Sequence, residues 1–151
     1  MNPNKGLLLF NKVYFYSELD RIAEEIINIL ERENKLWLFD AEMGAGKTTL
    51  IARLSAALGS EALVSSPTYG FINIYECKKI SGQIYHIDAY RLESEEEAIN
   101  IGIEDYLFDD KNYCMVEWPS RIEDIIPENY IYFHLVKISD IQREITIYAV
   151  S

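Results

Sequence analysis

Apolar residues along this chain recur with two spacings, one typical of helices and one typical of strands. The helical spacing is clearest at six positions near the N-terminus: Leu19, Ile22, Ala23, Ile26, Ile27 and Leu30. Residues three or four apart share one face of a helix. At the start of this stretch, Ser17 and Asp20 resemble a capping box, with Asp in place of the usual Glu. We therefore expect a helix that begins near Ser17 and buries one face.

Short apolar runs without alternation predict buried strands. Leu36–Phe39 and Tyr113–Glu117 are runs of this kind, and Leu63–Ser65, just before a proline, is a shorter candidate. After the first of these runs, Lys47–Leu58 has helical spacing and is followed by Gly59, a residue that commonly ends helices. These segments predict strands and helices in alternation.

The middle and the end of the chain contain alternating segments that predict antiparallel pairs. Phe71–Tyr75 and Ile84–Asp88 flank a polar turn that contains Gly82, as in a hairpin. The segments "NYIYFHLVKI" and "REITIYAV" form a second, closing pair.

One more helix is expected between these pairs, because Ser94 and Glu97 form a second capping-box pattern and Gly102 follows at a suitable distance. Helices and strands interleave early in the chain, and strands dominate late. The pattern predicts an α/β fold whose sheet has a parallel centre and antiparallel additions and is flanked by helices. We expect residues 1–151 to form a single domain.

Composition and charge limit the classes of protein to which this chain could belong. Hydrophobic residues make up 49% of the chain, which disfavours disorder, and the apolar runs are too short to span a membrane or to act as a signal peptide. A cytoplasmic protein is therefore expected. The net charge of −11 would repel a phosphate backbone, so we expect no independent binding of nucleic acid. A protein partner, or a small ligand in a locally basic pocket, fits this charge better.

Cysteines and histidines give no metal pattern. Cys77 and Cys114 have no C-x-x-C partner, and we expect reduced, partly buried thiols. His86 and His134 lie in strand-like runs without a second ligand at metal spacing, which favours structural roles.

The stretch "AEMGAGKT" fits the phosphate-binding loop G-x-x-x-x-G-K-[ST], except that Ala41 replaces the first glycine. Alanine can serve there if its φ is negative. Gly44 and Gly46 would let backbone N–H groups surround a phosphate, Lys47 would reach the β- and γ-phosphates, and Thr48 would coordinate Mg²⁺. The alternative is an ordinary turn with a chance lysine, which the preceding strand and following helix disfavour. We expect Lys47 to face solvent until phosphate arrives.

A phosphate loop needs an acid for the metal at the end of a neighbouring strand. Asp88 closes "IYHID" and Glu117 closes "YCMVE", although either could be a solvated carboxylate at the sheet edge. If Glu117 lies at the metal, Trp118 must lie close to the nucleotide. Thr68 in "SSPTY" could sense the γ-phosphate as switch threonines do, although such a turn is most often only a turn.

Five motifs in order resemble the TsaE family of bacterial ATPases, which are required to make threonylcarbamoyladenosine in tRNA. They are "GAGKTTL", "SSPTY", "IYHIDAYRLES", "GIEDYLF" and "VEWPSRI". The resemblance covers roughly residues 17 to 145, and five motifs in register make it specific.

The resemblance implies a fold of the P-loop NTPase type, with ATP and Mg²⁺ as cofactors, and it assigns roles to matching residues. It implies catalytic roles for Lys47, Thr68, Asp88 and Glu117. It implies nucleotide contacts for Gly44, Ala45, Gly46, Lys47, Thr48, Thr49, Trp118 and Arg143, and also around Tyr16 and Ser17. The implied metal ligands are Thr48, Glu117 and Asp88.

The same resemblance implies partners. Family members bind a complex of TsaD and TsaB in an ATP-dependent manner, and tRNA would be reached only through these partners. The chain departs from the family at Ala41 and Glu42, and it has Asn73 and Ile74 where a glutamate pair is common. Two other functions stay open: a small-molecule kinase, and a nucleotide-gated binding module without turnover.

Overall fold

The computed structural model of the chain describes residues 6–62, 64 and 70–151. Thr68 and most of the expected strand Leu63–Ser65 lie outside the described residues. None of the helices in the described part of the chain is long and apolar enough to cross a membrane.

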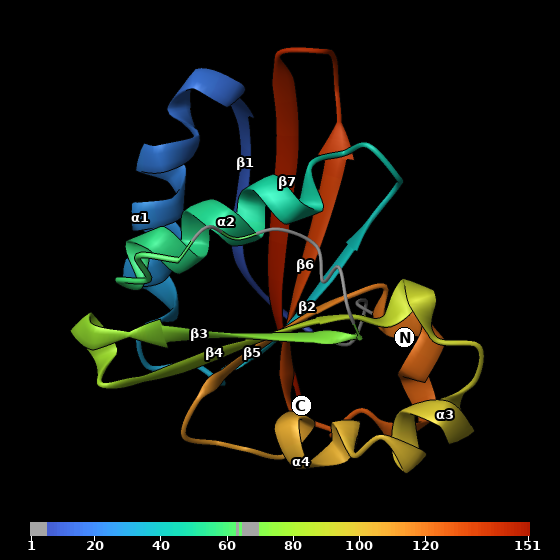
Figure 1. Cartoon of the computed structure of the whole chain (residues 1–151). Helices are drawn as coiled ribbons and strands as arrows, with labels where there is room; N and C mark the ends of the chain where they lie inside the picture. The colour runs from blue at the N-terminus through green and yellow to red at the C-terminus, as the bar shows by residue number, and fades with distance from the viewer. Residues whose placement is uncertain (1–5, 63, 65–69) are drawn as a thin grey trace.

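Seven strands of the described residues form one mixed sheet (Figure 1). The strands are β1 (Leu7–Phe15), β2 (Leu36–Ala41), β3 (Ile72–Cys77), β4 (Gly82–Asp88), β5 (Tyr113–Glu117), β6 (Tyr130–Lys137) and β7 (Gln142–Val150). Their order across the sheet is β1-β7-β6-β2-β5-β4-β3. The four central strands β6, β2, β5 and β4 are parallel, and β3, β7 and β1 are antiparallel to their neighbours. The predicted fold class is confirmed.

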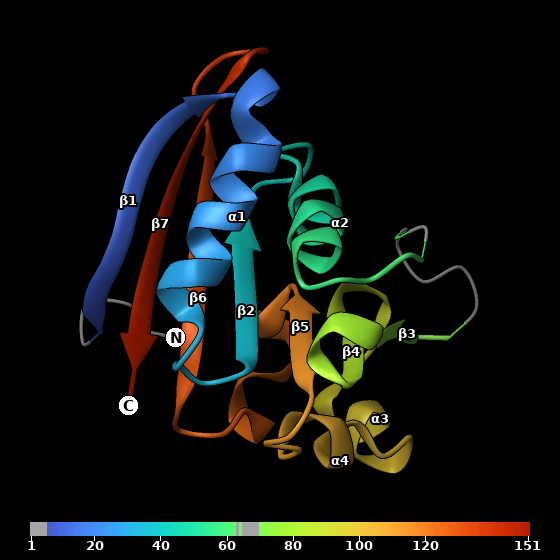
Figure 2. The same cartoon turned by 90° about the vertical axis from the view of Figure 1, so that its left-hand side faces the viewer.

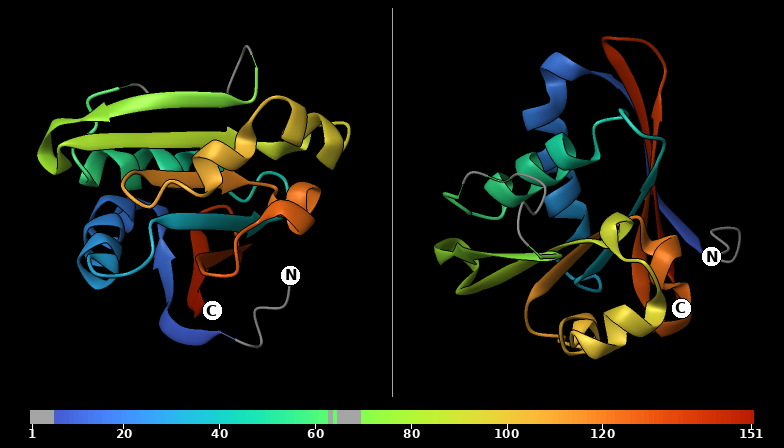
Figure 3. Two further views of the ribbon diagram at one scale, coloured as in Figure 1. Left: turned by 90° about the horizontal axis from the view of Figure 1, so that it is seen from below. Right: turned by 45° about the vertical axis from the view of Figure 1, so that its right-hand side comes forward.

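Helices cover both faces of the sheet (Figures 2 and 3). One layer consists of α1 (Leu19–Leu30) and α2 (Lys47–Ala57). The other consists of α3 (Glu95–Asn100), α4 (Ile103–Leu107) and the 3-10 segment η5 (Pro119–Ile125). Three shorter 3-10 turns are η2 (Tyr16–Glu18), η3 (Lys78–Ile80) and η4 (Ala89–Arg91).

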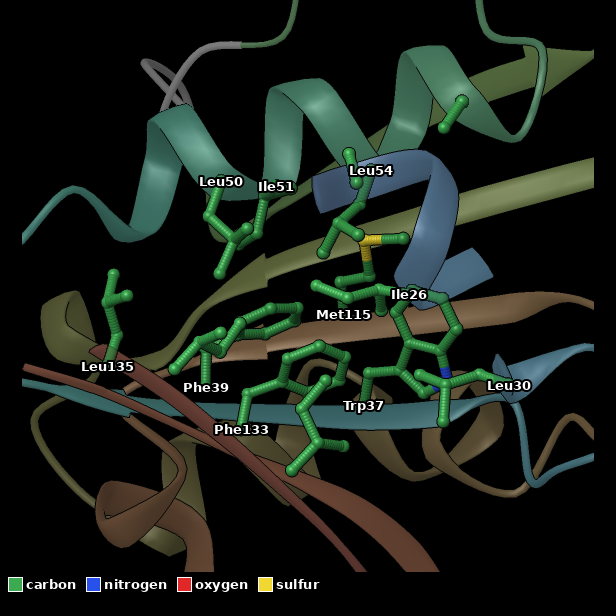
Figure 4. Packing of buried hydrophobic residues seen from close by; sticks show 14 of the residues in the cluster. Ile26, Leu30, Trp37, Phe39, Leu50, Ile51, Leu54, Met115, Phe133 and Leu135 are labelled. Carbon is green, nitrogen blue, oxygen red and sulfur yellow. The ribbon is translucent and has the colours of Figure 1, made fainter. Parts of the chain in front are cut away.

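Strand β2 explains why the central runs are apolar throughout. Trp37 and Phe39 pack under α1 and α2, whereas Leu36 and Leu38 face the α3 and α4 side. Phe39 stacks on Phe133 of β6, with ring centroids 4.4 Å apart (Figure 4). A parallel strand covered on both faces buries every side chain, so its sequence shows no alternation.

The start of α1 differs from the prediction, although its buried face agrees. The capping box expected from Ser17 and Asp20 is wrong. Instead, the Glu18 carboxylate accepts a hydrogen bond from the Phe15 backbone N–H at 3.0 Å, and α1 follows the turn η2. The chain passes from β1 into α1 through this turn, which places Glu18, rather than Ser17, beside the Phe15 N–H.

The second capping pattern is confirmed in its main contact. Ser94 Oγ accepts from the Glu97 N–H at 3.1 Å. The Glu97 carboxylate accepts from the N–H of Glu93, one residue earlier than the capping box requires, at 2.8 Å. Helix α3 ends before Gly102, whose φ of 81° allows the chain to leave the helix.

Candidate functional site

Residues 42–46 form a loop that joins the carboxyl end of β2 to α2, at the edge where β5 also ends (Figure 2). Gly44 (φ 81°) and Gly46 (φ 99°) have left-handed backbone, which glycine adopts without strain. A side chain at position 46 would also collide with the Tyr16 hydroxyl. The backbone conformation therefore favours glycine at position 46, and a larger residue would also displace the Tyr16 hydroxyl.

Ala41 stands where the phosphate-loop pattern has its first glycine. It is the last residue of β2, so its backbone is extended and alanine is accommodated without strain. Positive φ occurs outside glycine only at Ser81 and Trp118 among the described residues. The condition for alanine to serve in this loop, a negative φ, is met.

Lys47 is the first residue of α2, and its side chain is buried, with 7% of the residue exposed. Nζ donates a hydrogen bond to the Ala41 carbonyl at 2.9 Å and lies 3.8 Å from the centroid of the Trp118 ring. Burial lowers the pKa of Lys47, and nearby carboxylates, that of Glu117 first, oppose this shift. The expectation that Lys47 faces solvent is wrong, because a carbonyl and an aromatic face already hold the ammonium.

The two strand-end acids lie side by side, because Asp88 and Glu117 are paired residues of β4 and β5. Thr48 Oγ1 donates to Glu117 Oε1 at 3.1 Å. The other oxygen, Glu117 Oε2, lies 2.7 Å from His86 Nε2. Glu117 is only 3% exposed, so these contacts compensate the burial of its carboxylate.

Asp88 has a different environment. One carboxylate oxygen accepts a hydrogen bond from the Tyr90 N–H at 3.1 Å, and this contact caps the turn η4. The residue is 8% exposed and lies at the wall of the cleft described next. Its carboxylate is therefore positioned by the turn that follows its own strand.

A cleft of about 490 Å³ lies over this loop. It is lined by Glu42, Met43, Gly44, Gly46, Lys47, Thr48, Thr49, Asp88, Tyr90, Arg91, Glu117 and Trp118. Eight of the predicted site residues thus meet in one place: Gly44, Gly46, Lys47, Thr48, Thr49, Asp88, Glu117 and Trp118.

Two predicted nucleotide contacts, Ala45 and Arg143, do not line the cleft. Ala45, a residue of the loop, is buried, and its carbonyl accepts a hydrogen bond from Arg143 Nε at 2.9 Å. The Arg143 guanidinium carbon lies 4.4 Å from the centroid of the Tyr16 ring. Arg143 and Tyr16 therefore support the loop from behind, and direct contact of either with a nucleotide stays a prediction.

The sequence reasoning missed the cleft residues Glu42, Met43, Tyr90 and Arg91. Tyr90 and Arg91 come two and three residues after Asp88 in "IYHIDAYRL", so their closeness to that acid in the sequence was the available signal. The Tyr90 ring lies 5.0 Å from the Trp118 ring, centroid to centroid. Arg91 and Lys47 are the basic residues of the cleft lining in the described part of the chain.

The donor atoms at the mouth of the cleft suit a hard divalent cation. A hydroxyl and a carboxylate oxygen, from Thr48 and Glu117, already lie within hydrogen-bonding distance, and Asp88 adds a neighbouring carboxylate. Mg²⁺ prefers such oxygen ligands and usually takes only one or two carboxylates from the protein. The residues present therefore fit the predicted metal.

Comparison with known proteins identifies one family. Its sequence profile, described as "Threonylcarbamoyl adenosine biosynthesis protein TsaE", matches residues 15–145. Proteins named tRNA threonylcarbamoyladenosine biosynthesis protein TsaE from Bacillus subtilis and Haemophilus influenzae are 35% and 38% identical to this chain. The alignments cover 74% and 69% of this chain, and 67% and 65% of the two relatives.

A third relative of the same name, from Treponema pallidum, is 29% identical, with 81% of this chain and 87% of the relative covered. Among solved structures, a crystal structure of YdiB from Bacillus subtilis matches with a TM-score of 0.68 and 23% identity. That match covers 96% of this chain and 88% of the other. At this identity it supports the fold alone.

Proposed function

The chain belongs to the TsaE family, and we propose that it binds and hydrolyses ATP as a subunit of the machinery that makes threonylcarbamoyladenosine in tRNA. The contact between Thr48 and Glu117 carries the proposal. These residues are 69 positions apart, and both were expected to hold the metal from their places in separate motifs. A chance glycine turn would not bring a hydroxyl of its helix onto the acid of a neighbouring strand.

The loop and the first turn of α2 would bind the phosphates. The N-terminus of a helix attracts anions through its free N–H groups and its dipole. Lys47 begins this helix, and Arg91 adds a second positive charge across the cleft. A phosphate that draws Lys47 away from Ala41 and Trp118 would gain a charged donor already inside the cleft.

Thr48, Glu117 and Asp88 would hold Mg²⁺. When bound, this ion would neutralise charge on the β- and γ-phosphates. Glu117 would place one carboxylate oxygen beside Thr48, and Asp88 would add the second carboxylate of the metal site. Thr68 remains our candidate for sensing the γ-phosphate.

The partner would be a complex of the TsaD–TsaB type. The family places the chain in a tRNA-modification pathway, and the net charge of −11 disfavours direct contact with tRNA. The partners would therefore bind the tRNA, and this chain would act on them in an ATP-dependent manner.

Phosphate release from Mg·ATP tests this function against its alternatives. We expect slow release by the isolated chain and faster release when TsaD–TsaB is added. Release that requires a small-molecule acceptor, with the phosphate found on that acceptor, would instead identify a kinase. Nucleotide binding with no release under either condition would identify a binding module.

A further inference from the structure

His86 is fully buried, yet both nitrogens of its ring lie beside polar groups. Period-two spacing in β4 places Ile84, His86 and Asp88 on one face, and Ile84 belongs to the core beneath α1 and α2. The His86 side chain therefore points toward α2, where its Nε2 meets Glu117. Apolar packing alone does not require a histidine at this position.

The other ring nitrogen also has a partner. His86 Nδ1 lies 3.3 Å from the Tyr75 hydroxyl on β3, and Asn73 Nδ2 donates to that same hydroxyl at 3.2 Å. A hydroxyl has one proton to donate. An ionised carboxylate can only accept, so Nε2, which meets Glu117, carries a proton, and Nδ1 of this tautomer is the acceptor for the Tyr75 hydroxyl.

The result is one direction of donation across three adjacent strands: Asn73 to Tyr75, Tyr75 to His86, and His86 to Glu117. At its far end, Glu117 also accepts from Thr48. A carboxylate bound through one oxygen can still rotate about that contact. Held by His86 on Oε2 and Thr48 on Oε1, the Glu117 carboxylate has its orientation fixed.

We propose that His86 is a positioning residue, which directs the Glu117 carboxylate toward Thr48, and that Tyr75 and Asn73 fix the tautomer that allows it. This role rests on the proposed function, because it assigns Glu117 to the metal. Partners behind a ligand commonly change metal affinity or activity by about 10- to 100-fold when they are removed. The effect should fall on turnover rather than on nucleotide affinity, because none of the three residues lines the cleft.

The tautomer can be measured without any activity. The chain has two histidines, so ¹⁵N-histidine NMR gives two ring systems, and a His134→Gln variant assigns them. We expect His86 to show a protonated Nε2 and an unprotonated Nδ1 in the wild-type chain, and Tyr75→Phe to produce a mixture. A protonated Nδ1 in the wild type, or no change in Tyr75→Phe, would overturn the proposal.

Two matched variants test the consequence for turnover. The amide nitrogen of His86→Gln can reach the position of Nε2, whereas that of His86→Asn reaches only the position of Nδ1. We expect His86→Asn to lower kcat about 10- to 100-fold with little change in the KM for ATP, and His86→Gln to recover most of this loss. Thermal melting of both variants controls for folding, and the NMR result stands if His86→Asn does not fold.

The outcomes separate this inference from the proposed function. Equal losses in both variants, or a rise in KM alone, would contradict the positioning role while leaving the ATPase in place. A wild-type chain that hydrolyses no ATP, with or without partners, would contradict the proposed function and, with it, the positioning role of His86 in turnover.

Discussion

Lys47 makes two contacts that a bound phosphate would have to replace. Its ammonium lies 3.8 Å from the Trp118 ring centroid and donates to Ala41. Trp118 itself has φ 56° and ψ 52°, a left-handed conformation that is uncommon for a bulky residue and is often found at functional sites. The indole is therefore placed where it would report on the lysine.

We predict that ADP or ATP changes the fluorescence of Trp118, because the nucleotide draws the Lys47 ammonium away from the indole. Trp37 is fully buried and donates to the Asn34 carbonyl at 3.0 Å, so its emission should stay constant. A Trp118→Phe variant leaves the core intact and should remove the change. The measurement is a fluorescence titration with binding confirmed by calorimetry, and a flat wild-type titration despite binding would exclude Trp118 from the site.

Single elements depend on local polar contacts as well as on the core. Asp109 organises the chain between α4 and β5: one carboxylate oxygen accepts from the N–H groups of Lys111 and Asn112. The other oxygen accepts from the Tyr85 hydroxyl and the Asn112 amide. These hydrogen bonds, that from the Asn112 side chain first, lower the pKa of Asp109 to about 2.

We predict that Asp109→Ala lowers the free energy of unfolding by about 1 kcal/mol at pH 6. Because the folded-state pKa is depressed, the contribution is present above the ordinary value of 3.8 and is lost as the pH falls toward 2. Urea unfolding at pH 6 and pH 2.5 measures the difference. The exposed neighbour Asp110, changed to Ala, is the control, and an Asp109→Ala deficit that is equal at both pH values would contradict the prediction.

The helices and strands also show which parts of the fold could be predicted from the sequence. The central strands, α1 and α2 were predictable, because burial on one face or on both produces a clear spacing. β1 was not predicted, because it is an edge strand whose register shifts between Leu8 and Phe10, so its apolar residues follow no single alternation. Helix α4, with five residues, is too short to show a period of its own.

The same limit applies to the site: residues in a local motif could be predicted, and contacts between distant segments could not. Lys47, Thr48, Asp88 and Glu117 were predictable because each belongs to a motif or ends a strand. The burial of Lys47 was not, because it depends on Trp118, which comes from a distant part of the chain. The sequence favours a structural role for His86, because its contact with Glu117 exists only when β4 and β5 are paired in the sheet.

The chain as a whole is strongly acidic. An arginine supplied by a partner can raise the rate of P-loop enzymes by about 10³–10⁵, so the slow turnover that we propose for the isolated chain leaves ample room for a partner to act. The net charge of −11 favours a basic docking surface on that partner.

We predict that a TsaD–TsaB complex binds this chain in ATP but not in ADP or without nucleotide, because the γ-phosphate would complete the docking surface. Thr68→Ala should weaken this docking more than it weakens ATP binding, and Thr49→Ala provides a comparison in the first turn of α2. Gel filtration in the three nucleotide states measures complex formation. Equal complex formation in all three would make the chain a passive subunit.

The central claim is that ATP is hydrolysed at the loop that begins α2, and Lys47→Met tests it most directly. Methionine keeps the buried stem of the lysine and removes only the ammonium, so the fold should survive. We expect phosphate release to fall by about 10²-fold or more, both alone and with TsaD–TsaB. Lys78→Met, which removes the same charge at an exposed position between β3 and β4, should release phosphate at the parent rate. Hydrolysis by Lys47→Met at the parent rate would contradict the assignment of this loop as the site of ATP.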